Sequence, residues 1–225
     1  MTCLTNTIGF IFLTLAILLG GLKYIYGGPT KPFTLPLGKP IKTSKEVQAE
    51  IVAVLDEAPG NIAVSKEGRV FINYHPEGHP THRVLEIIDG KPVPWPNEEW
   101  QSSRGNGEPY FDNVFSLRID RQDRLWTLDT GFHGLKQPRL LAFNYETKEL
   151  VHRWDIPKDV AGYGSYTQDF QVSNDGKFIF IADIGIFNLS PSIIVYDIEA
   201  KKGRRVLENH PSVVAKPYDI NAKGH

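Results

Sequence analysis

Three stretches of the sequence share one pattern: GNIAVSKEGRVFINY (Gly60–Tyr74), FSLRIDRQDRLWTLD (Phe115–Asp129) and QDFQVSNDGKFIFIAD (Gln168–Asp183). Each has a short alternating run, a polar turn, and a second run rich in β-branched and aromatic residues. That order is typical of a β-hairpin. The turn residues Gly68, Asp123 and Gly176 are 55 and 53 residues apart. The chain therefore contains one repeated unit of about 54 residues.

Each hairpin is followed by two more predicted strands. The third strands are Arg83–Ile88, Arg139–Asn144 and Ser192–Ile198, and the fourth are Pro92–Trp95, Leu150–Trp154 and Arg204–Leu207. Four strands in each repeat is the pattern of a β-propeller blade. The sequence therefore predicts an all-β fold, a β-propeller of four-stranded blades at residues 58–97, 112–157 and 166–210.

Three blades do not close a ring, because propellers have about four to eight of them. An open ring would leave two apolar sheet faces bare, which favours aggregation. We therefore expect this chain to be the N-terminal half of a longer protein, truncated or split. Its expected partner is the missing half of the propeller or a second copy of the chain.

The segment before the repeats divides into two parts, at residues 1–27 and 28–44, ahead of the partial propeller at 45–225. Ile8–Leu22 carries no charge and, with Tyr24–Tyr26, approaches the length that spans a bilayer. The pattern favours a transmembrane anchor over a cleaved signal peptide or a buried helix. Residues 28–44 are rich in Pro and Gly and predict an irregular linker. We expect a membrane-anchored or secreted protein with its domain outside the cytoplasm.

Composition excludes several classes of function. The 25 basic and 26 acidic residues give a net charge of −1, so no basic surface is available for nucleic acid. A single Cys excludes an intrachain disulfide and a zinc site made of Cys ligands. The expected partners are instead the membrane and a small-molecule ligand.

Polar residues recur at both ends of the inner hairpins. Seven residues before the turn positions stand Asn61, Ser116 and Asp169, and six or seven residues after them stand Tyr74, Asp129 and Asp183. The start of the first strand and the end of the second lie on one side of a blade. We therefore expect these residues, with Gln168, His75, Thr130 and His133 nearby, to line one mouth of the channel, where propellers commonly bind ligands.

Two kinds of ligand suit such a mouth. Carboxylate and amide oxygens could hold Ca²⁺ or another divalent cation, with Asp169 and Asn61 as the metal candidates. The same oxygens could bind a cationic amine. For Asp129 and Asp183 the alternative is a structural one, because each begins an Asp-x-Gly turn. The three His residues at His75–His82 could bind a transition metal, although the intervening Pro and Gly favour a flexible loop.

The chain is similar to the yellow / major royal jelly protein family over about Val52 to Val214. The motifs that carry this resemblance are Gly60–Ser65 with Gly68–Phe71, Val93–Asn97, Asp123–Gly131, Pro138–Phe143, and Ile193–Asp197 leading to His210–Ser212. The resemblance implies a six-bladed propeller, usually secreted and present in bacteria too, of which about the last three blades are absent here. Some such proteins isomerise dopachrome, and others bind biogenic amines.

A more distant resemblance is to the regucalcin- and gluconolactonase-like propellers, which bind a divalent metal. The position of their metal-binding Glu holds Ala58, with Glu57 beside it, and their Asn position falls near Gln168. The blade that carries their Asp is not present. The first hypothesis is therefore an exported small-ligand-binding propeller with no demonstrated catalysis. The alternatives are a metal-dependent lactone hydrolase and a non-catalytic scaffold, so the sequence does not decide whether the protein is an enzyme.

Overall fold

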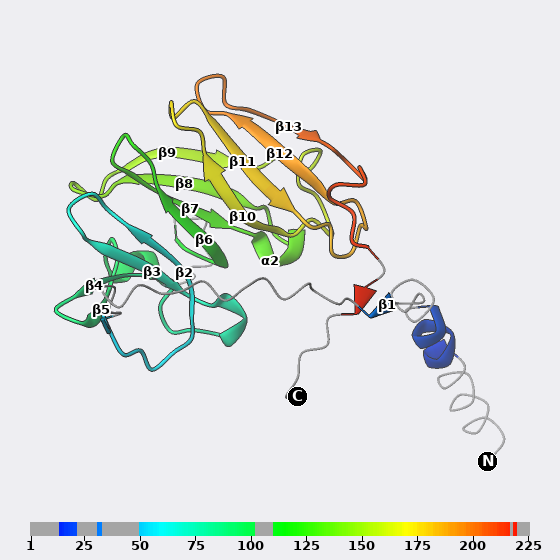
Figure 1. Ribbon diagram of the computed structural model, residues 1–225, viewed down its shortest axis with the longest axis horizontal. Coiled ribbons are helices and arrows are strands. Elements are labelled where there is room, and N and C mark those ends of the chain that lie inside the picture. Colours follow the sequence, from blue (N-terminus) through cyan, green and yellow to red (C-terminus); the bar gives the residue numbers. More distant parts are fainter. Residues whose placement is uncertain (1–13, 22–30, 33–49, 102–109, 217, 220–225) are drawn as a thin grey trace, which may run out of the picture. The chain divides into compact units, whose positions relative to one another are not determined.

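The computed structural model describes residues 14–21, 31–32, 50–101, 110–216 and 218–219 (Figure 1). The chain forms two compact units, one of residues 1–47 with 215–225 and the other of residues 48–214. The larger unit contains all three predicted repeats.

In the smaller unit, residues 14–21 are helical, and β1 (Lys31–Pro32) pairs in parallel with β14 (Tyr218–Asp219). Within the described part of the chain, no helix is both long and apolar enough to cross a membrane. The rest of the helix predicted at 1–27 lies outside the described residues, as does most of the predicted linker at 28–44. Within the predicted linker, the described residues Lys31–Pro32 form a two-residue strand.

The larger unit contains three four-stranded sheets. The first consists of β2 (Pro59–Val64), β3 (Val70–Tyr74), β4 (Val84–Ile88) and β5 (Lys91–Pro94). The second consists of β6 (Val114–Ile119), β7 (Arg124–Asp129), β8 (Arg139–Asn144) and β9 (Leu150–Asp155). The third consists of β10 (Thr167–Val172), β11 (Phe178–Asp183), β12 (Ser192–Asp197) and β13 (Lys202–Val206).

Strand order follows the sequence in all three sheets, and the paired strands within each are antiparallel. This arrangement confirms the predicted all-β fold with its repeated four-stranded unit. In the described parts of the connections lie three short helices: η1 (Pro76–Gly78), η2 (Glu98–Gln101) and α2 (Gly131–Gly134). Figure 1 shows β2, β6 and β10 as the strands by which neighbouring sheets meet, and β6 contacts both of the others.

The turn that joins the first two strands has the same conformation in each sheet. Gly68, Asp123 and Gly176 all have positive φ angles, of 86°, 59° and 69°. Gly adopts this left-handed region freely, and Asp tolerates it better than most residues. The three residues from which the repeat was measured are therefore structurally equivalent.

One apolar core lies between the first and second sheets. Phe71 of β3 and Leu117 of β6 are fully buried in it. Trp95 follows β5 and meets Phe71 edge-on, with ring centroids 5.4 Å apart, and Phe143 of β8 at 5.2 Å. The aromatic residues of one repeat therefore pack against those of the next.

A second core lies between the second and third sheets. Trp154 of β9 stacks on Tyr196 of β12, with centroids 3.8 Å apart and planes at 11°. Gly203 of β13 makes room for this stack, because a Cβ atom there would lie 2.4 Å from the Trp154 ring. Since the second sheet takes part in both cores, it is buried on both faces.

His152 of β9 lies at the edge of the second core and makes the stability of the folded state depend on pH. Burial, helped by the positive charges of Lys201 and Arg124, lowers the pKa of His152 below its ordinary value of 6.5. Its Nε2 lies 2.7 Å from the Tyr196 hydroxyl. Burial raises the pKa of Tyr196 to about 12, so that hydroxyl keeps its proton and can donate to the neutral imidazole.

The folded state therefore favours neutral His152, and its contribution to stability should be complete above pH 6.5. As the pH falls below 6.5, His152 of the unfolded chain binds a proton before that of the folded chain. The contribution to stability therefore decreases with falling pH, and this decrease ends once the pH is below the pKa of the folded state. We expect the difference in unfolding free energy between wild type and His152→Gln to shrink as the pH is lowered from neutral to mildly acidic. Urea unfolding across this range measures it, and a constant difference would contradict the prediction.

Candidate functional site

Each inner strand is irregular at its start. The pairing register shifts between Pro59 and Ile62 in β2, between Val114 and Ser116 in β6, and between Thr167 and Asp169 in β10. Such β-bulges redirect side chains and are frequent beside functional sites. They lie at the three places where the repeat predicted polar residues.

Asn73 of β3 stabilises the irregularity in β2. Its side-chain oxygen accepts a hydrogen bond from the Asn61 N–H at 2.8 Å, and its amide nitrogen donates to the Val114 carbonyl at 2.9 Å. This buried amide therefore connects β2 to the neighbouring sheet. The sequence analysis missed Asn73, because a single Asn in an apolar strand carries no distinctive signal.

The structure brings together Asn61, Ser116 and Asp169, which are far apart in the sequence. Ser116 Oγ donates to Asp169 Oδ1 at 2.5 Å, and Asn61 Nδ2 donates to Ser116 Oγ at 3.4 Å. One residue from each inner strand thus contributes to a single hydrogen-bonded row. This is the juxtaposition that the spacing from the turn residues predicted.

Arg118 of β6 completes this group, which we call the inner cluster (Asn61, Ser116, Arg118 and Asp169). Its Nη1 donates to Asn61 Oδ1 at 2.6 Å, and its Nη2 lies 2.8 Å from both oxygens of Asp169. The Arg118 side chain is 22% exposed, whereas the Asp169 side chain is 48% exposed. Part of the Asp169 side chain therefore faces solvent, while Arg118 bonds to its carboxylate from the less exposed side.

The sequence analysis also missed Arg118. It stands two residues after Ser116 in β6, and residues two apart on a strand point to the same face. The alternation could therefore have placed it in the cluster. Its charge was not selected because neither of the other inner strands has an Arg at that position.

Gln168 does not join the inner cluster. It lies within the irregularity of β10 and is exposed. At the matching position of β6, Phe115 is buried and meets the rings of His75 and Tyr166 edge-on, with centroids 5.4 and 5.0 Å away. The same backbone feature thus supports a packed aromatic ring in one sheet and an exposed amide in the other.

Asp129 and Asp183 have structural partners on both carboxylate oxygens. Asp129 accepts hydrogen bonds from the N–H groups of Asp112, Asn113 and Gly131, at 2.9, 3.1 and 3.1 Å. Asp183 accepts from the N–H groups of Tyr166 and Gly185, at 2.7 and 3.0 Å. Both carboxylates therefore cap turns, which is the structural alternative that the sequence left open.

An arginine neutralises each of these buried carboxylates. Arg139 Nη2 lies 3.1 Å from Asp129, and Arg205 Nη1 lies 2.7 Å from Asp183. With their oxygens occupied and their side chains buried, Asp129 and Asp183 have the surroundings of structural residues, so the geometry favours turn capping over a place in a binding mouth. Counting from the turn residues placed Asp129 and Asp183 at the strand ends, but it could not identify their arginine partners, because Arg139 and Arg205 lie on other strands.

The histidine candidates do not converge. His133 lies in α2, and its side chain is outside the described residues. His75 accepts a weak hydrogen bond from the Glu77 N–H at 3.4 Å, and His82 lies 3.3 Å from Glu98. Among the residues that the structure describes, no group of three or more His, Cys, Asp or Glu side chains could hold a metal ion.

The inner cluster does not fit Ca²⁺ or another divalent cation. Ca²⁺ takes about six to eight oxygen ligands, whereas the oxygens of Asn61 and Asp169 already face the Arg118 guanidinium. Because those oxygens are already engaged by the guanidinium, too few remain to complete the coordination shell of a metal. The expectation of a metal at Asp169 and Asn61 is therefore not supported by the geometry.

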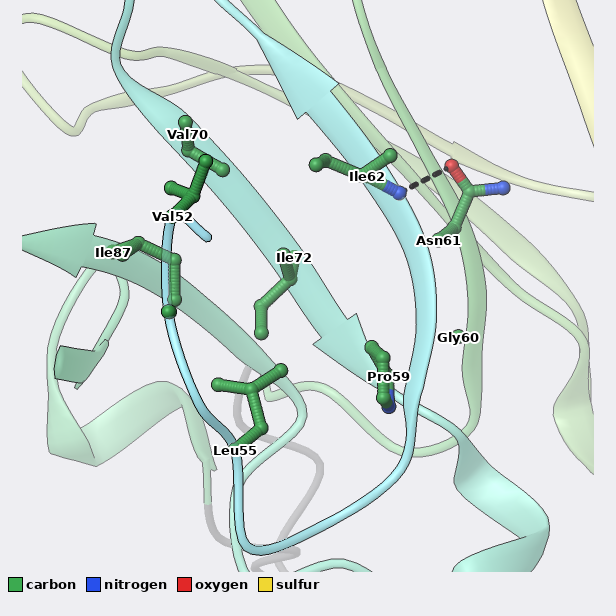
Figure 2. Close-up of a pocket in the computed structure, with 10 residues that line it drawn as sticks. Val52, Leu55, Pro59, Gly60, Asn61, Ile62, Val70, Ile72 and Ile87 are labelled. Atoms are coloured by element: carbon green, nitrogen blue, oxygen red, sulfur yellow. Dashed lines mark hydrogen bonds between the residues drawn. The ribbon is translucent and has the colours of Figure 1, made fainter. Parts of the chain in front are cut away.

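A separate cavity of about 290 Å³ lies on the face of the first sheet that is turned away from the second (Figure 2). Its walls are Val52, Ala53, Leu55, Pro59, Gly60, Asn61, Ile62, Val70, Ile72 and Ile87. Figure 2 shows the Asn61 side chain directed away from the aliphatic walls. An apolar hollow of this kind suits a packing partner rather than catalysis.

The family model and the curated relatives that match this chain all carry the same family description. The family model described as major royal jelly protein matches residues 113–225. Major royal jelly protein 1 of Apis mellifera is 35% identical over 80 residues, which are 34% of this chain and 18% of that protein. Major royal jelly protein 7 of the same organism is 27% identical over 125 residues, which are 51% of this chain and 27% of that protein. The chain thus spans less than a third of the length of either relative.

Comparison with solved structures gives weaker likenesses. Kuenenia stuttgartiensis hydrazine synthase matches with a TM-score of 0.46 at 13% identity, over 66% of this chain and 37% of that one. YCF48 bound to D1 peptide matches with a TM-score of 0.44 at 9% identity, over 72% of this chain and 44% of that one.

Proposed function

The chain belongs to the major royal jelly protein family, and we propose that it supplies three consecutive blades of an exported, six-bladed β-propeller that binds a small ligand. The three equivalent sheets and their sequential strand order support the propeller. The uncharged stretch Ile8–Leu22 supports export, and protease treatment of intact cells tests it. The ligand binds at the channel mouth, beside the inner cluster.

One observation supports the proposed ligand site. The Asp169 carboxylate is half exposed although it is bonded to Arg118 and Ser116. The Asp183 side chain, whose oxygens cap a turn and bond to Arg205, is by contrast 0% exposed. The exposed edge of Asp169 can accept hydrogen bonds from a ligand. A protonated primary amine supplies three such donors and a complementary charge.

The lactone hydrolase is not proposed, because that chemistry needs a divalent metal and the inner cluster does not fit one. The residues of the cluster support binding alone. Arg118 orients the Asp169 carboxylate, and Asp169 receives the ammonium group.

The role of Asp169 is tested with phenethylamine as the probe. We expect calorimetric titration of the full chain to show binding that Asp169→Asn weakens about tenfold or more, since hydrogen bonds to charged groups contribute roughly 1.5–3 kcal/mol. The neutral analogue 2-phenylethanol should bind wild type and variant equally weakly. Thermal melting shows whether the variant remains folded.

Asp175→Asn is the matched control, because Asp175 lies in the β10–β11 turn of the same sheet, at the far end of the strand from Asp169. It should leave phenethylamine binding unchanged. Equal binding of amine and alcohol by the wild type, or equal losses in the two variants, would show that Asp169 does not receive the ligand.

A further inference from the structure

A polar pocket adjoins the inner cluster, and we call it the arginine pocket. It lies between residues of β6 and β10, two inner strands that are in contact (Figure 1). The second sheet contributes Arg118, Asp120 and Arg121 to its lining, and the third contributes Gln171 and Asn174. Its volume of about 170 Å³ far exceeds the roughly 10–15 Å³ that a single water needs. The pocket therefore has room for a carboxylate or phosphate group.

Arg121 brings to this pocket a positive charge that no described side chain neutralises. It is exposed and stands in the turn between β6 and β7. Within the part of the chain that the structure describes, its guanidinium takes part in no hydrogen bond or ion pair. The guanidinium of Arg124, three residues later, lies instead 2.7 Å from the Asp120 carboxylate. Because a guanidinium matches the geometry of carboxylate and phosphate groups, Arg121 is suited to bind an anion.

Arg118 has one donor left for a group in the arginine pocket. Its Nη1 donates to Asn61 Oδ1 and to the Leu117 carbonyl, and its Nη2 donates to both oxygens of Asp169. A guanidinium has five N–H donors. The Nε–H of Arg118 is therefore the one without an acceptor among the described residues, and it can bond to an anion while the other four maintain the inner cluster.

The carboxylate in the lining of the arginine pocket would not repel an anion strongly, because it is already neutralised. Asp120 Oδ2 accepts hydrogen bonds from Arg124 Nε and Trp126 Nε1, both at 2.7 Å. Its Oδ1 accepts from the N–H groups of Gln122 and Arg124, at 2.9 and 3.0 Å. The Asp120 side chain is only 2% exposed. The charge that the pocket offers to a ligand is therefore positive.

The charges of the arginine pocket and the inner cluster do not balance. Arg118 and Arg121 carry two positive charges, whereas Asp169, their exposed acidic neighbour, carries one negative charge. The two sites together therefore have a net charge of +1, and an ammonium group bound to Asp169 would raise it to +2. An acidic group on the same ligand would offset that excess.

We propose that the arginine pocket binds a carboxylate or phosphate group, and that the ligand of the inner cluster is a zwitterion whose acidic end occupies this pocket. Asp169 and Gln171 are two residues apart on β10, which corresponds to about 7 Å along a strand. The ammonium and the acidic group are thus separated by an aromatic ring or a short chain. The ammonium end rests on the proposed amine site at Asp169, whereas the acidic end does not.

Calorimetric titration of the full chain with matched compounds tests this. The probe 4-(2-aminoethyl)benzoate is phenethylamine with an added carboxylate. We expect wild type to bind it about tenfold or more tightly than phenethylamine, since hydrogen bonds to charged groups are the strong ones. Arg121→Gln should remove this advantage and leave the affinity for phenethylamine itself unchanged. Equal affinities of wild type for the two compounds would overturn the proposal.

Arg204→Gln is the matched control, because Arg204 is also exposed but lies on β13, the outermost strand of the third sheet. It should keep the tenfold advantage, and equal losses in the two variants would contradict a role for Arg121. Thermal melting shows whether each variant is folded. Because Arg121 has no described partner in the fold, its replacement should leave the melting temperature unchanged.

The anion 4-ethylbenzoate, which lacks the amine, separates this proposal from the amine site. It should bind wild type and Asp169→Asn, and Arg121→Gln should weaken its binding. If this is observed while phenethylamine does not bind, the amine site fails and the anion pocket stands. If phenethylamine binds through Asp169 but neither carboxylate compound depends on Arg121, the anion pocket fails and the amine site stands.

Discussion

Replacing Arg205 with methionine is expected to lower the free energy of unfolding by about 3–5 kcal/mol, because it leaves a buried carboxylate without its counter-ion. Arg205 Nη1 lies 2.7 Å from Asp183, whose side chain is 0% exposed. The same guanidinium donates to the carbonyls of Val160 and Ser190, at 2.8 and 2.5 Å. Methionine keeps much of the aliphatic stem, so the loss measures mainly the charge and its hydrogen bonds. Urea unfolding at neutral pH measures the change.

Two further variants separate charge from packing. Arg153→Met removes the partner of Asp155 in a pair whose two side chains are both about 40% exposed, and it should cost about 1 kcal/mol or less. Adding Asp183→Asn to Arg205→Met should recover part of the lost stability, because the uncompensated charge is then gone. A cost for Arg205→Met no larger than that for Arg153→Met would mean that the buried pair does not hold the third sheet together.

Trp126→Ala is the second substitution with a large expected effect, a loss of about 3–5 kcal/mol. The Trp126 side chain is fully buried between the second and third sheets. Its Nε1 donates to Asp120 Oδ2 at 2.7 Å, and Arg124 lies over its ring. Alanine would remove the indole, leave a cavity in the core, and take a hydrogen bond from the buried Asp120. Urea unfolding measures this loss too.

Phe180→Ala is the comparison that isolates burial. Phe180 holds the position of Trp126 in the third sheet, but it is 43% exposed. Its replacement should cost about 1–2 kcal/mol, because the Phe180 ring removes less apolar surface from water on folding than Trp126 does. Equal losses at the two positions would contradict the view that the third sheet has an uncovered face.

Two aspartates of the third sheet have different surroundings, although both stand near the same end of their strands. Asp183 ends β11 and is enclosed by backbone N–H groups and Arg205. Asp169 begins β10 at an irregularity in the register, and its carboxylate stays half exposed. An enclosed, fully bonded carboxylate stabilises a turn, whereas a half-exposed one held by Arg118 can still meet a ligand.

The sequence was sufficient to predict the repeat. Alternating apolar residues and the turn positions Gly68, Asp123 and Gly176 are local signals, and the structure places them in equivalent hairpins of three equivalent sheets. Counting from those turns also placed Asn61, Ser116 and Asp169 at matching points of the inner strands. Such predictions succeed because strand periodicity and turn conformation depend on residues that are neighbours in the chain.

The partners of those residues could be identified only from the tertiary structure. Arg205 lies 22 residues from Asp183, and Arg118 lies 51 residues from Asp169. Similarly, the spacing of the repeat did not show that Phe115 is buried while Gln168 is exposed. Exposure and ion pairing depend on how one sheet packs on the next, and that packing joins side chains from separate repeats. The sequence therefore determined where the polar residues stand, and the packing of the sheets determined which of them are buried in ion pairs and which stay exposed to solvent.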